Sequence, residues 1–379
     1  MGCFLGRKGL APPPQRLPSR LEPTSAPSHG AVVLRAGQCV RLAPLHAAIG
    51  VPTPGNVPGD IVATYYAQRA EAGLLVTEGV APAADGLGYA SIPGLFTAEQ
   101  VAGWKTVTDA VHAKGSHIFV QLMHTGRASA PQNLPEGARV VGPSAIALGQ
   151  DVWTDAAGNQ PAPVPHALTD AEIESVIEAY AQSSALAIEA GFDGVEIHGA
   201  NGYLVDPFFN TASNERTDRW GGSVENRIRF AVEVCKRAAA RIGGDRVGIR
   251  ISPYGVFNNM VPDADMDAVY LALATELSLL GLAYVHVVDH SAMGAPPVPD
   301  SVKAAIRANF GGTYLLSGGY DRARAEADLD AGKGELVAFG RPFLSNPRLP
   351  TLMKEGGELR APDFATFYTP GPVGYTDFA

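Results

Sequence analysis

The sequence predicts an α/β fold: a single-domain (β/α)8 TIM barrel with a β-rich excursion after its third strand. Three observations support this class. From about residue 39, short apolar runs alternate with longer helix-like stretches, and there are eight of each. The 379 residues, 46% hydrophobic and 18% charged, suit one large barrel with insertions. Residues 130–165 are rich in Pro and Gly and weakly periodic, as expected of a hairpin or cap outside the barrel.

The expected elements alternate along the chain. The strands are Val40–Pro44, Leu74–Thr77, His117–Leu122, Gly194–His198, Val247–Ser252, Tyr284–Val288, Tyr314–Ser317 and Leu336–Phe339. The helices are Gly59–Ala72, Ala98–Lys114, Asp170–Ala190, Val224–Ile242, Ala264–Leu280, Ser301–Asn309, Asp321–Ala331 and Pro347–Lys354. Because periodicity does not show whether strands close into a barrel, a doubly wound sheet stays open as an alternative.

The helix expected over 170–190 has clear boundary chemistry. Thr169 or Asp170 can cap its first N–H groups, and Glu172 lies in the positive first turn. Gly191 follows as a residue that can end the helix in a left-handed conformation. We therefore expect this helix to be well defined at both ends.

Composition and charge argue against several classes of protein. The formal net charge is −9 and no basic cluster occurs beyond the first twenty residues, so nucleic acid is not an expected partner. Cys3, Cys39 and Cys235 form neither a disulfide framework nor a CxxC pair, which is typical of a reducing, cytoplasmic compartment. No apolar run reaches the roughly 18 residues that a membrane helix needs. We expect a small-molecule substrate, no membrane partner, and a monomer or homodimer.

The N-terminal segment, residues 1–38, is atypical, and we assign the barrel to residues 39–379. The first thirty residues are rich in Pro, Arg and Ser, and Glu22 is the one acid among them. A transit peptide and a disordered tail share this composition, but the prolines oppose an amphipathic helix. We adopt the disordered tail as the expectation.

Two expected strands end in glycine where TIM barrels commonly bind phosphate, after strands seven and eight. Strand seven runs into Ser317, Gly318 and Gly319, and strand eight runs into Gly340 and Arg341. Glycines let backbone N–H groups approach an anion, and arginine supplies a charged fork. Glycine after a strand can also be a simple turn, but the two positions together favour a phosphate site. No GxGxxG follows a strand, so a Rossmann site is not supported.

The most informative segment is GFDGVEIHGANGYL, residues 191–204. Since side chains alternate along a strand, Glu196 and His198 share the face that points into the barrel. Asn201 and Tyr203 lie just beyond the strand end. His and Asn can donate hydrogen bonds to an oxygen that gains negative charge, and Tyr can deliver a proton. A single His at a strand end is commonly structural, but the His-x-x-Asn-x-Tyr pattern at this place favours catalysis.

Two further polar residues lie in strands whose inward side chains are usually apolar. Gln121 lies near the end of the third expected strand, and Arg250 lies within the fifth. A buried guanidinium needs a partner, so Arg250 indicates an anionic or carbonyl-rich ligand. An internal ion pair, for instance with Glu196, is the equally open structural alternative.

Together these motifs resemble the old yellow enzyme family of flavin-dependent ene reductases, in the family's order over about residues 40–379. The matching segments are residues 191–204, SNERTDRWGGSVENR (213–227), YYAQRAEAGLLVTEG (65–79), RISPYGVF (250–257), SGGY (317–320), FGRPFLSNP (339–347) and the GYTDF tail. The resemblance implies a TIM barrel that binds FMN non-covalently and uses NADPH or NADH, as an enzyme of the NADPH dehydrogenase type. It also implies reduction of C=C bonds conjugated to a carbonyl or nitro group.

The resemblance further implies roles for individual residues. His198 and Asn201 would bind the activating oxygen of the substrate, and Tyr203 would protonate the α-carbon. The implied cofactor-binding residues are Pro44, Leu45, His46, Gly79, Gln121, Arg250, Gly318, Gly319, Gly340 and Arg341. The implied further residues of the substrate pocket are Tyr89, Phe257 and Tyr368. No metal is implied.

The N-terminal part departs from the family's pattern. Residues 1–38 do not resemble the family's opening strand and hairpin, His46 stands where Thr or Cys is usual, and Ala47 replaces the usual Arg. A local reading-frame change over 46–50 would account for this, and sequencing the gene tests it. Met123 replaces a frequent Trp. A flavin-binding barrel with impaired or diverged activity is therefore the alternative function.

A TIM-barrel lyase or aldolase without flavin is the remaining alternative. The common aldolase class needs a Schiff-base lysine, and none of the expected strands ends in Lys. A metal lyase needs clustered ligands, and His117 and His124 form no recognisable set. The Schiff-base aldolase and the metal-dependent lyase are therefore both disfavoured.

Overall fold

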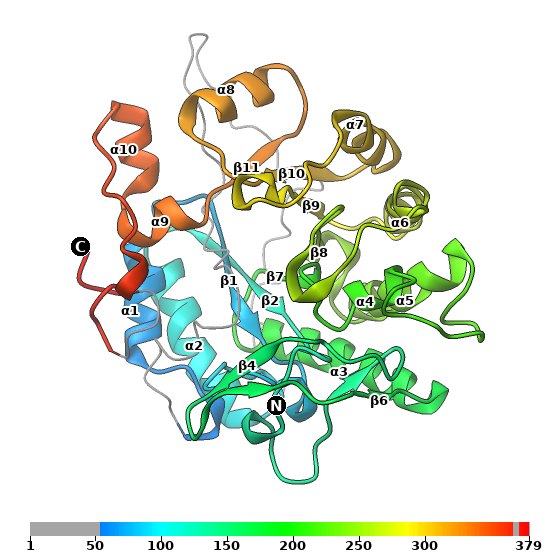
Figure 1. Cartoon of the computed structure of the whole chain (residues 1–379). Helices are drawn as coiled ribbons and strands as arrows, with labels where there is room; N and C mark the ends of the chain where they lie inside the picture. The colour runs from blue at the N-terminus through cyan, green and yellow to red at the C-terminus, as the bar shows by residue number, and fades with distance from the viewer. Residues whose placement is uncertain (1–53, 367–370, 379) are drawn as a thin grey trace, which may run out of the picture.

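A computed structural model describes residues 54–366 and 371–378, which form a curled parallel sheet surrounded by helices (Figure 1). Within this part of the chain, seven strands are hydrogen-bonded to one another in chain order. A doubly wound sheet reverses its strand order at a switch point, and these strands show no reversal. The strands are β1 Leu74–Val80, β2 His117–Leu122, β7 Gly194–Gly199, β8 Val247–Ile251, β9 Tyr284–Val288, β10 Thr313–Ser317 and β11 Leu336–Ala338.

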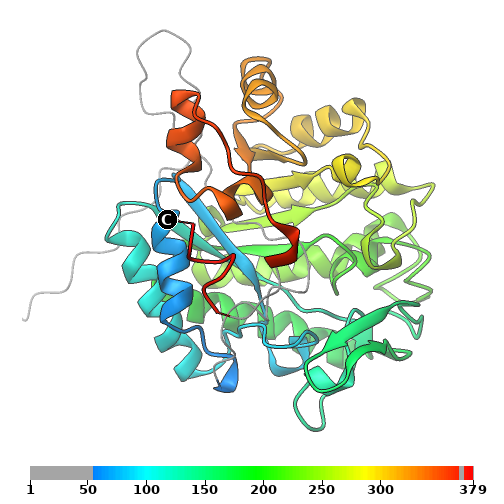
Figure 2. The same cartoon turned by 60° about the vertical axis from the view of Figure 1, so that its left-hand side comes forward.

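Helices follow the strands and cover the outer face of the sheet, so the predicted TIM barrel is confirmed (Figures 1 and 2). The principal helices are α1 Asp60–Gln68, α2 Ala98–His112, α3 Asp170–Glu189, α5 Val224–Ile242, α6 Met266–Leu279, α7 Asp300–Asn309, α8 Arg322–Asp330 and α10 Leu349–Glu355. These elements agree with the expected ones to within a few residues at their ends. The expected first strand, Val40–Pro44, lies outside the described residues.

Two short helices were missed by the sequence analysis: α4 Asp206–Phe209 and α9 Arg341–Ser345. Each has a proline in its first turn and spans about one turn, which is too short for apolar periodicity to show. Across the described ranges, none of the helices is long and apolar enough to cross a membrane.

The boundary chemistry of α3 is as predicted. Thr169 Oγ1 accepts the backbone N–H of Glu172, and the Glu172 carboxylate accepts the N–H of Thr169 at 2.8 Å. This reciprocal capping box satisfies two donors that the helix start leaves open. Gly191 follows α3 with φ of 88°, the left-handed conformation expected of a helix terminator.

The excursion after β2 is β-rich, as predicted. β4 Asp151–Thr154 and β5 Gly158–Pro161 form an antiparallel hairpin, while β3 Val141–Gly142 pairs with β6 His166–Ala167. Val152 of β4 belongs to an apolar cluster with Tyr89, Met123 and Tyr203, among others. The excursion therefore packs against the mouth of the barrel, over the loop that carries Tyr203.

Alternation along the strands produces an apolar layer low in the barrel interior. This layer includes Val76, Phe119, Tyr284 and Leu315, all buried. A Cβ at Gly194 would lie 2.5 Å from the Phe119 ring, and one at Gly248 would lie 2.3 Å from the Tyr284 ring. Glycine is required at both positions because the aromatic rings fill the space.

Candidate active site

A layer of polar side chains lies directly above this apolar layer, two residues further along each strand. Its members are Gln121, Glu196, Arg250, His286 and Ser317, all buried. Gln121 Nε2 donates a hydrogen bond to Glu196 Oε1 at 2.6 Å. His286 bridges two strands, with Nδ1 2.9 Å from Glu196 Oε2 and Nε2 3.0 Å from Ser317 Oγ. Gln121, Glu196, His286 and Ser317 therefore form one continuous hydrogen-bonded network, and Arg250 of β8 lies beside His286 in the strand register.

Burial and facing charges set the protonation of this layer. Burial acts to raise the pKa of Glu196, but the charges of His286 and Arg250 and the hydrogen bonds from His286 and Gln121 lower it overall. Burial also lowers the pKa of His286, against the opposing effect of Glu196. Glu196 is therefore ionised, and it is stabilised by hydrogen bonds from His286 and Gln121 and by the nearby positive charge of Arg250.

Arg250 is not the ion-pair partner of Glu196 that the structural alternative had suggested. Glu196 is instead hydrogen-bonded to His286 at 2.9 Å, and no contact ion pair of Arg250 is found among the described residues. Arg250 Nε and Nη1 are buried and have no hydrogen-bond partner in the described part of the chain. Burial lowers the pKa of Arg250 to about 10, so the side chain stays cationic at neutral pH. A buried cation with open donors needs an acceptor-rich ligand.

His198 stands at the upper end of β7, beside Arg250 in the strand register. Its Nδ1 accepts the backbone N–H of Ala200 at 3.3 Å. Burial, followed by the charges of Arg250, His286 and His290, lowers the pKa of His198 well below its ordinary value. The ring is therefore neutral and carries its proton on Nε2, which makes Nε2 a hydrogen-bond donor.

Asn201 follows in a left-handed backbone conformation, with φ of 60°. Its backbone N–H donates to Ser252 Oγ at 2.9 Å, and its carbonyl accepts from Asn258 Nδ2 at 2.8 Å. Its side-chain Oδ1 lies 2.7 Å from Nε2 of His290. Among the described residues, the Nδ2 group of Asn201 donates no hydrogen bond, which leaves it for a ligand. A left-handed residue that several hydrogen bonds hold in place is typical of a functional loop.

Tyr203 lies against His198, edge to face, with ring centroids 4.8 Å apart. Tyr89 also packs edge to face against Tyr203, with ring centroids 5.9 Å apart. Burial, together with the charge of Tyr203 and a hydrogen bond to it, raises the pKa of Tyr89 well above its ordinary value. Phe257 lies 4.8 Å from the ring of His290. The structure therefore brings His198, Asn201, Tyr203, Tyr89 and Phe257 to one end of the barrel, as predicted.

A cavity of about 320 Å³ opens beside this group, at the ends of β9, β10 and β11. Its lining includes the predicted residues Arg250, Gly318, Gly319, Gly340 and Arg341, together with His290.

The two glycines after β10 are required by their surroundings. Gly318 has φ of 118°, and a Cβ there would lie 2.0 Å from the Asp289 carbonyl oxygen. Gly319 has φ of 64°, and a Cβ there would lie 2.5 Å from Cβ of Ala292. The chain after β10 can thus pass close to the segment after β9 only without side chains. The resulting cradle, with Arg341 on its wall, fits a phosphate group.

The other predicted cofactor residues are distributed as follows. Gly79 lies at a register shift in β1, and a Cβ there would lie 2.5 Å from Sδ of Met123. Met123 thus packs against the backbone at the place where the family resemblance expects a wider aromatic side chain. The predicted residues Pro44, Leu45, His46 and Tyr368 lie outside the described residues.

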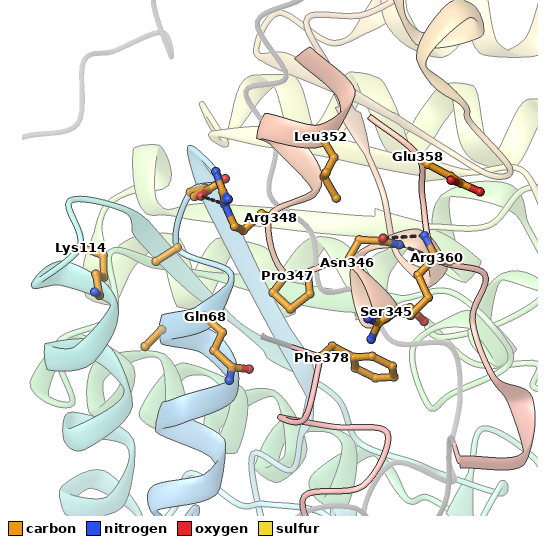
Figure 3. Close-up of a pocket in the computed structure, with 13 residues that line it drawn as sticks. Gln68, Lys114, Ser345, Asn346, Pro347, Arg348, Leu352, Glu358, Arg360 and Phe378 are labelled. Carbon is orange, nitrogen blue, oxygen red and sulfur yellow. Dashed lines mark hydrogen bonds and ion pairs between the residues drawn. The ribbon is translucent and has the colours of Figure 1, made fainter. Parts of the chain in front are cut away.

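A larger cavity, about 650 Å³, lies between α1, α10 and the C-terminal segment (Figure 3). None of its lining residues comes from a strand of the sheet. Arg348 pairs with Glu71 at 3.0 Å, and Arg360 lies over the ring of Phe378. Because these cations are already engaged and the barrel mouth is elsewhere, we place the active site at the smaller cavity.

Three buried residues of this region were missed by the sequence analysis: His286, His290 and Asp206. The alternation in YVHVV places His286 on the inner face of β9, by the same rule that placed Glu196 on β7, so this signal was available. His290 lies two residues past the end of β9, at the same rim as the predicted site. Nothing local to Asp206 indicates that its carboxylate accepts the backbone N–H of Gly202 at 2.8 Å.

Comparison with known proteins agrees with this arrangement. The sequence pattern of the NADH:flavin oxidoreductase / NADH oxidase family matches residues 41–360. The chain is 44% identical to the chanoclavine-I aldehyde reductase of Penicillium roqueforti, over 86% of this chain and 88% of the relative. It is 40% identical to the "Probable flavin mononucleotide-dependent alkene reductase" of Leishmania infantum, over 85% of this chain and 88% of the relative.

Two solved structures are similar throughout the fold. Morphinone reductase superposes with a TM-score of 0.85 at 40% identity, covering 91% of this chain and 92% of the other. The old yellow enzyme homologue from Zymomonas mobilis gives a TM-score of 0.85 at 37% identity, covering 91% of this chain and 95% of the other. At 37–40% sequence identity, the similarity shows membership of the same family as well as the same fold.

Proposed function

The chain belongs to the NADH:flavin oxidoreductase / NADH oxidase family as an old yellow enzyme homologue, and from this premise we propose how its own residues carry out the reaction. It is an FMN-dependent oxidoreductase that reduces activated carbon–carbon double bonds with a nicotinamide nucleotide. The specific substrates we propose are α,β-unsaturated carbonyl and nitro compounds, and the enzyme type is an NADPH dehydrogenase that accepts NADPH or NADH.

The residues at the barrel mouth fit FMN. The open donors of Arg250 would suit the carbonyl-rich edge of a flavin ring, and we assign Gln121 and Gly79 to the same ring from the family resemblance. The cradle of Gly318, Gly319, Gly340 and Arg341 suits the phosphate. FMN bound there would supply the redox chemistry, which is hydride transfer between the nicotinamide and the alkene.

The observation that carries the proposal is the pair of donors formed by His198 and Asn201. Neutral His198 presents Nε2–H because its Nδ1 accepts from Ala200. Asn201 presents Nδ2–H because its Oδ1 is occupied by His290. We assign both groups to the activating oxygen of the substrate, where negative charge develops as the double bond is reduced. Each preorganised donor of this kind contributes about 3–4 kcal/mol to stabilising the transition state.

Tyr203 completes the proposed site as the proton donor. Its ring is buried and packs against both His198 and Tyr89, so the hydroxyl has a restricted range of positions. The phenol gives its proton to the α-carbon, and solvent restores it afterwards. Positioned proton donors of this kind accelerate a step by about 10²–10⁴-fold.

Further properties remain part of the proposal. A small-molecule substrate, the absence of a nucleic-acid partner, a cytoplasmic location and a monomeric or homodimeric state accord with the acidic charge and scattered cysteines. We also propose that residues 39–379 make up the FMN-binding barrel; residues 1–38 lie outside the described residues.

The visible spectrum of the purified protein and its turnover test this function. We expect a yellow protein that oxidises NADPH under anaerobic conditions and then reduces 2-cyclohexenone or maleimide. A colourless protein that takes up no added FMN would contradict the cofactor assignment. Flavin reduction without alkene turnover would instead indicate the impaired barrel, and would direct attention to the region around His46.

A further inference from the structure

His290 lies at the junction between the proposed substrate site and the cofactor cavity. It begins a turn, His290–Met293, directly after β9. Asp289 caps this turn by accepting the N–H of Ser291 at 2.9 Å, and its carboxylate pairs with Lys303 at 2.6 Å. Gly294 ends the turn in a left-handed conformation. The imidazole is therefore held on a short, doubly anchored segment.

The His290 ring makes one directed contact with the site. Its Nε2 lies 2.7 Å from Oδ1 of Asn201, and both side chains are buried. An amide oxygen only accepts hydrogen bonds, so Nε2 carries the proton of this bond. Burial, followed by the charge of Arg250, lowers the pKa of His290 to about 3, so the ring is neutral and holds a single proton.

This contact determines which way the Asn201 amide faces. The oxygen and the nitrogen of a side-chain amide diverge from the same trigonal carbon, so a donor fixed on Oδ1 turns Nδ2 away from His290. The backbone of Asn201 is held independently, by Ser252 and Asn258. Those two bonds place the Cα but leave rotation of the amide free, and His290 supplies the missing restraint.

We infer that His290 is a positioning residue, which acts through Asn201 to present the amide N–H to the activating oxygen of the substrate. The inference rests on the proposed function, since it assigns the purpose of an Asn201 donor. It adds a residue from the β9 turn to a site otherwise built from the loop after β7. Phe257, 4.8 Å from the His290 ring, limits the positions that the imidazole can take.

The affinity for a phenolic ligand reports on this donor, because a phenolate oxygen resembles the developing charge on the substrate. We would titrate 4-hydroxybenzaldehyde into FMN-loaded protein and follow the flavin absorbance. His290→Phe and His290→Leu remove the donor and should each weaken binding on the order of tenfold. His290→Gln keeps an N–H that can reach Asn201 and should restore affinity to within a few-fold of the wild type.

The dependence on Asn201 separates positioning from direct binding. If His290 acts through Asn201, adding His290→Phe to Asn201→Ala should weaken the phenol no further. An equal loss in both backgrounds would show that His290 contacts the ligand itself and would overturn the inference. Wild-type affinity for the phenol in His290→Phe and His290→Leu would also overturn the inference. If neither donor-free variant retains FMN, His290 belongs to the cofactor site, and the inference is also wrong.

Failure of the proposed function gives a different result. Wild-type protein that binds no phenol, or no FMN, contradicts the proposed function before His290 is tested. Wild-type protein that binds both, with unaltered His290 variants, contradicts only the positioning role. The thermal unfolding midpoint of each FMN-loaded variant serves as the internal reference, since a general structural defect would lower it.

Discussion

The carboxylate of Asp206 lies 2.8 Å from the backbone N–H of Gly202, the residue that directly follows Asn201. Asp206 is buried, and Tyr270 and Ser252 approach the same oxygens at 3.4 and 3.5 Å. Since Ser252 Oγ also accepts the N–H of Asn201, one hydrogen-bonded unit holds two consecutive peptide groups of the proposed catalytic loop. The conformation of Asn201 therefore depends on a carboxylate that comes four residues after Gly202 in the chain.

Asp206 should make stability depend on pH in a specific window. Burial raises its pKa from 3.8 to about 7, so the folded state favours the protonated form. An acid whose pKa is raised on folding stabilises the folded state at pH values below its pKa in the unfolded chain. This contribution is lost as the pH rises from about 4, near the unfolded pKa, to about 7, near the folded pKa. Asp206→Asn should remove that slope, which reaches at most about 1.4 kcal/mol per pH unit for one proton.

Urea unfolding of both proteins at a series of pH values between 4 and 8 measures the slope. Asp330→Asn, at an exposed position at the end of α8, is the matched control and should keep the wild-type pH dependence. Parallel curves for Asp206→Asn and the wild type would mean that Asp206 titrates normally in the folded protein.

Gly318 should be needed for full FMN affinity. Gly318→Ala forces a Cβ to within 2.0 Å of the Asp289 carbonyl oxygen, so the chain after β10 must move away from the β9 turn. Overpacking of this kind costs about 1–3 kcal/mol, which corresponds to roughly tenfold weaker FMN binding or more. Equilibrium titration of the apoprotein with FMN, followed by flavin fluorescence, gives the dissociation constant.

Gly332→Ala separates backbone strain from damage to the cradle. Gly332 also has a positive φ, 68°, but a Cβ there would meet no atom within 4 Å. Its alanine variant should lose some stability and bind FMN as the wild type does. If both variants bind FMN equally well, the segment after β10 does not hold the phosphate.

The parts of this site that were predictable are those encoded by local pattern. Period-two alternation placed Glu196 and His198 inside the barrel, and the position of glycines after strands indicated the cavity at β10 and β11. Asn201 and Tyr203 followed because they come directly after a strand at the catalytic end. Each of these inferences needs only residues close in sequence and the rule that active sites of TIM barrels lie at the C-terminal ends of the strands.

The contacts that complete the site join residues far apart in the chain, and no local pattern reveals them. His290 reaches Asn201 across 89 positions, and His286 reaches Glu196 across 90. Arg250 and Glu196 lie on adjacent strands but make no contact ion pair among the described residues. Glu196 is hydrogen-bonded to His286, which reaches over from β9, and Arg250 acts on Glu196 as a nearby charge. Helix α4 was missed for the converse reason, since four residues are too few for a periodic pattern.

His198 and Asn201 should dominate the binding of anionic oxygen. Replacing both with alanine removes two donors, and hydrogen bonds to charged groups contribute about 1.5–3 kcal/mol each. We expect phenol affinity to fall by roughly 10²-fold or more, while FMN content stays unchanged. The double variant His117→Ala/Asn309→Ala changes the same residue types at exposed positions and should bind as the wild type. Unchanged phenol affinity in the His198/Asn201 variant would exclude this pair as the oxygen site.

Tyr203→Phe should separate the two halves of the reaction. The substitution removes the hydroxyl but keeps the ring that packs against His198 and Tyr89, so the site should retain its shape. Flavin reduction by NADPH needs no proton from this phenol and should proceed at close to the wild-type rate. Alkene reduction should slow by about 10²–10⁴-fold, because the α-carbon loses its positioned proton donor.

Anaerobic rapid mixing measures the two rates separately, by flavin absorbance with NADPH alone and then with 2-cyclohexenone. Tyr314→Phe is the matched control, since it deletes a buried hydroxyl on β10 that has no hydrogen-bond partner among the described residues. Both of its half-reactions should match the wild type. Equal slowing of the two half-reactions in Tyr203→Phe would assign Tyr203 to cofactor binding or folding. Another group would then have to protonate the α-carbon, because phenylalanine keeps the ring packing but has no hydroxyl proton to give.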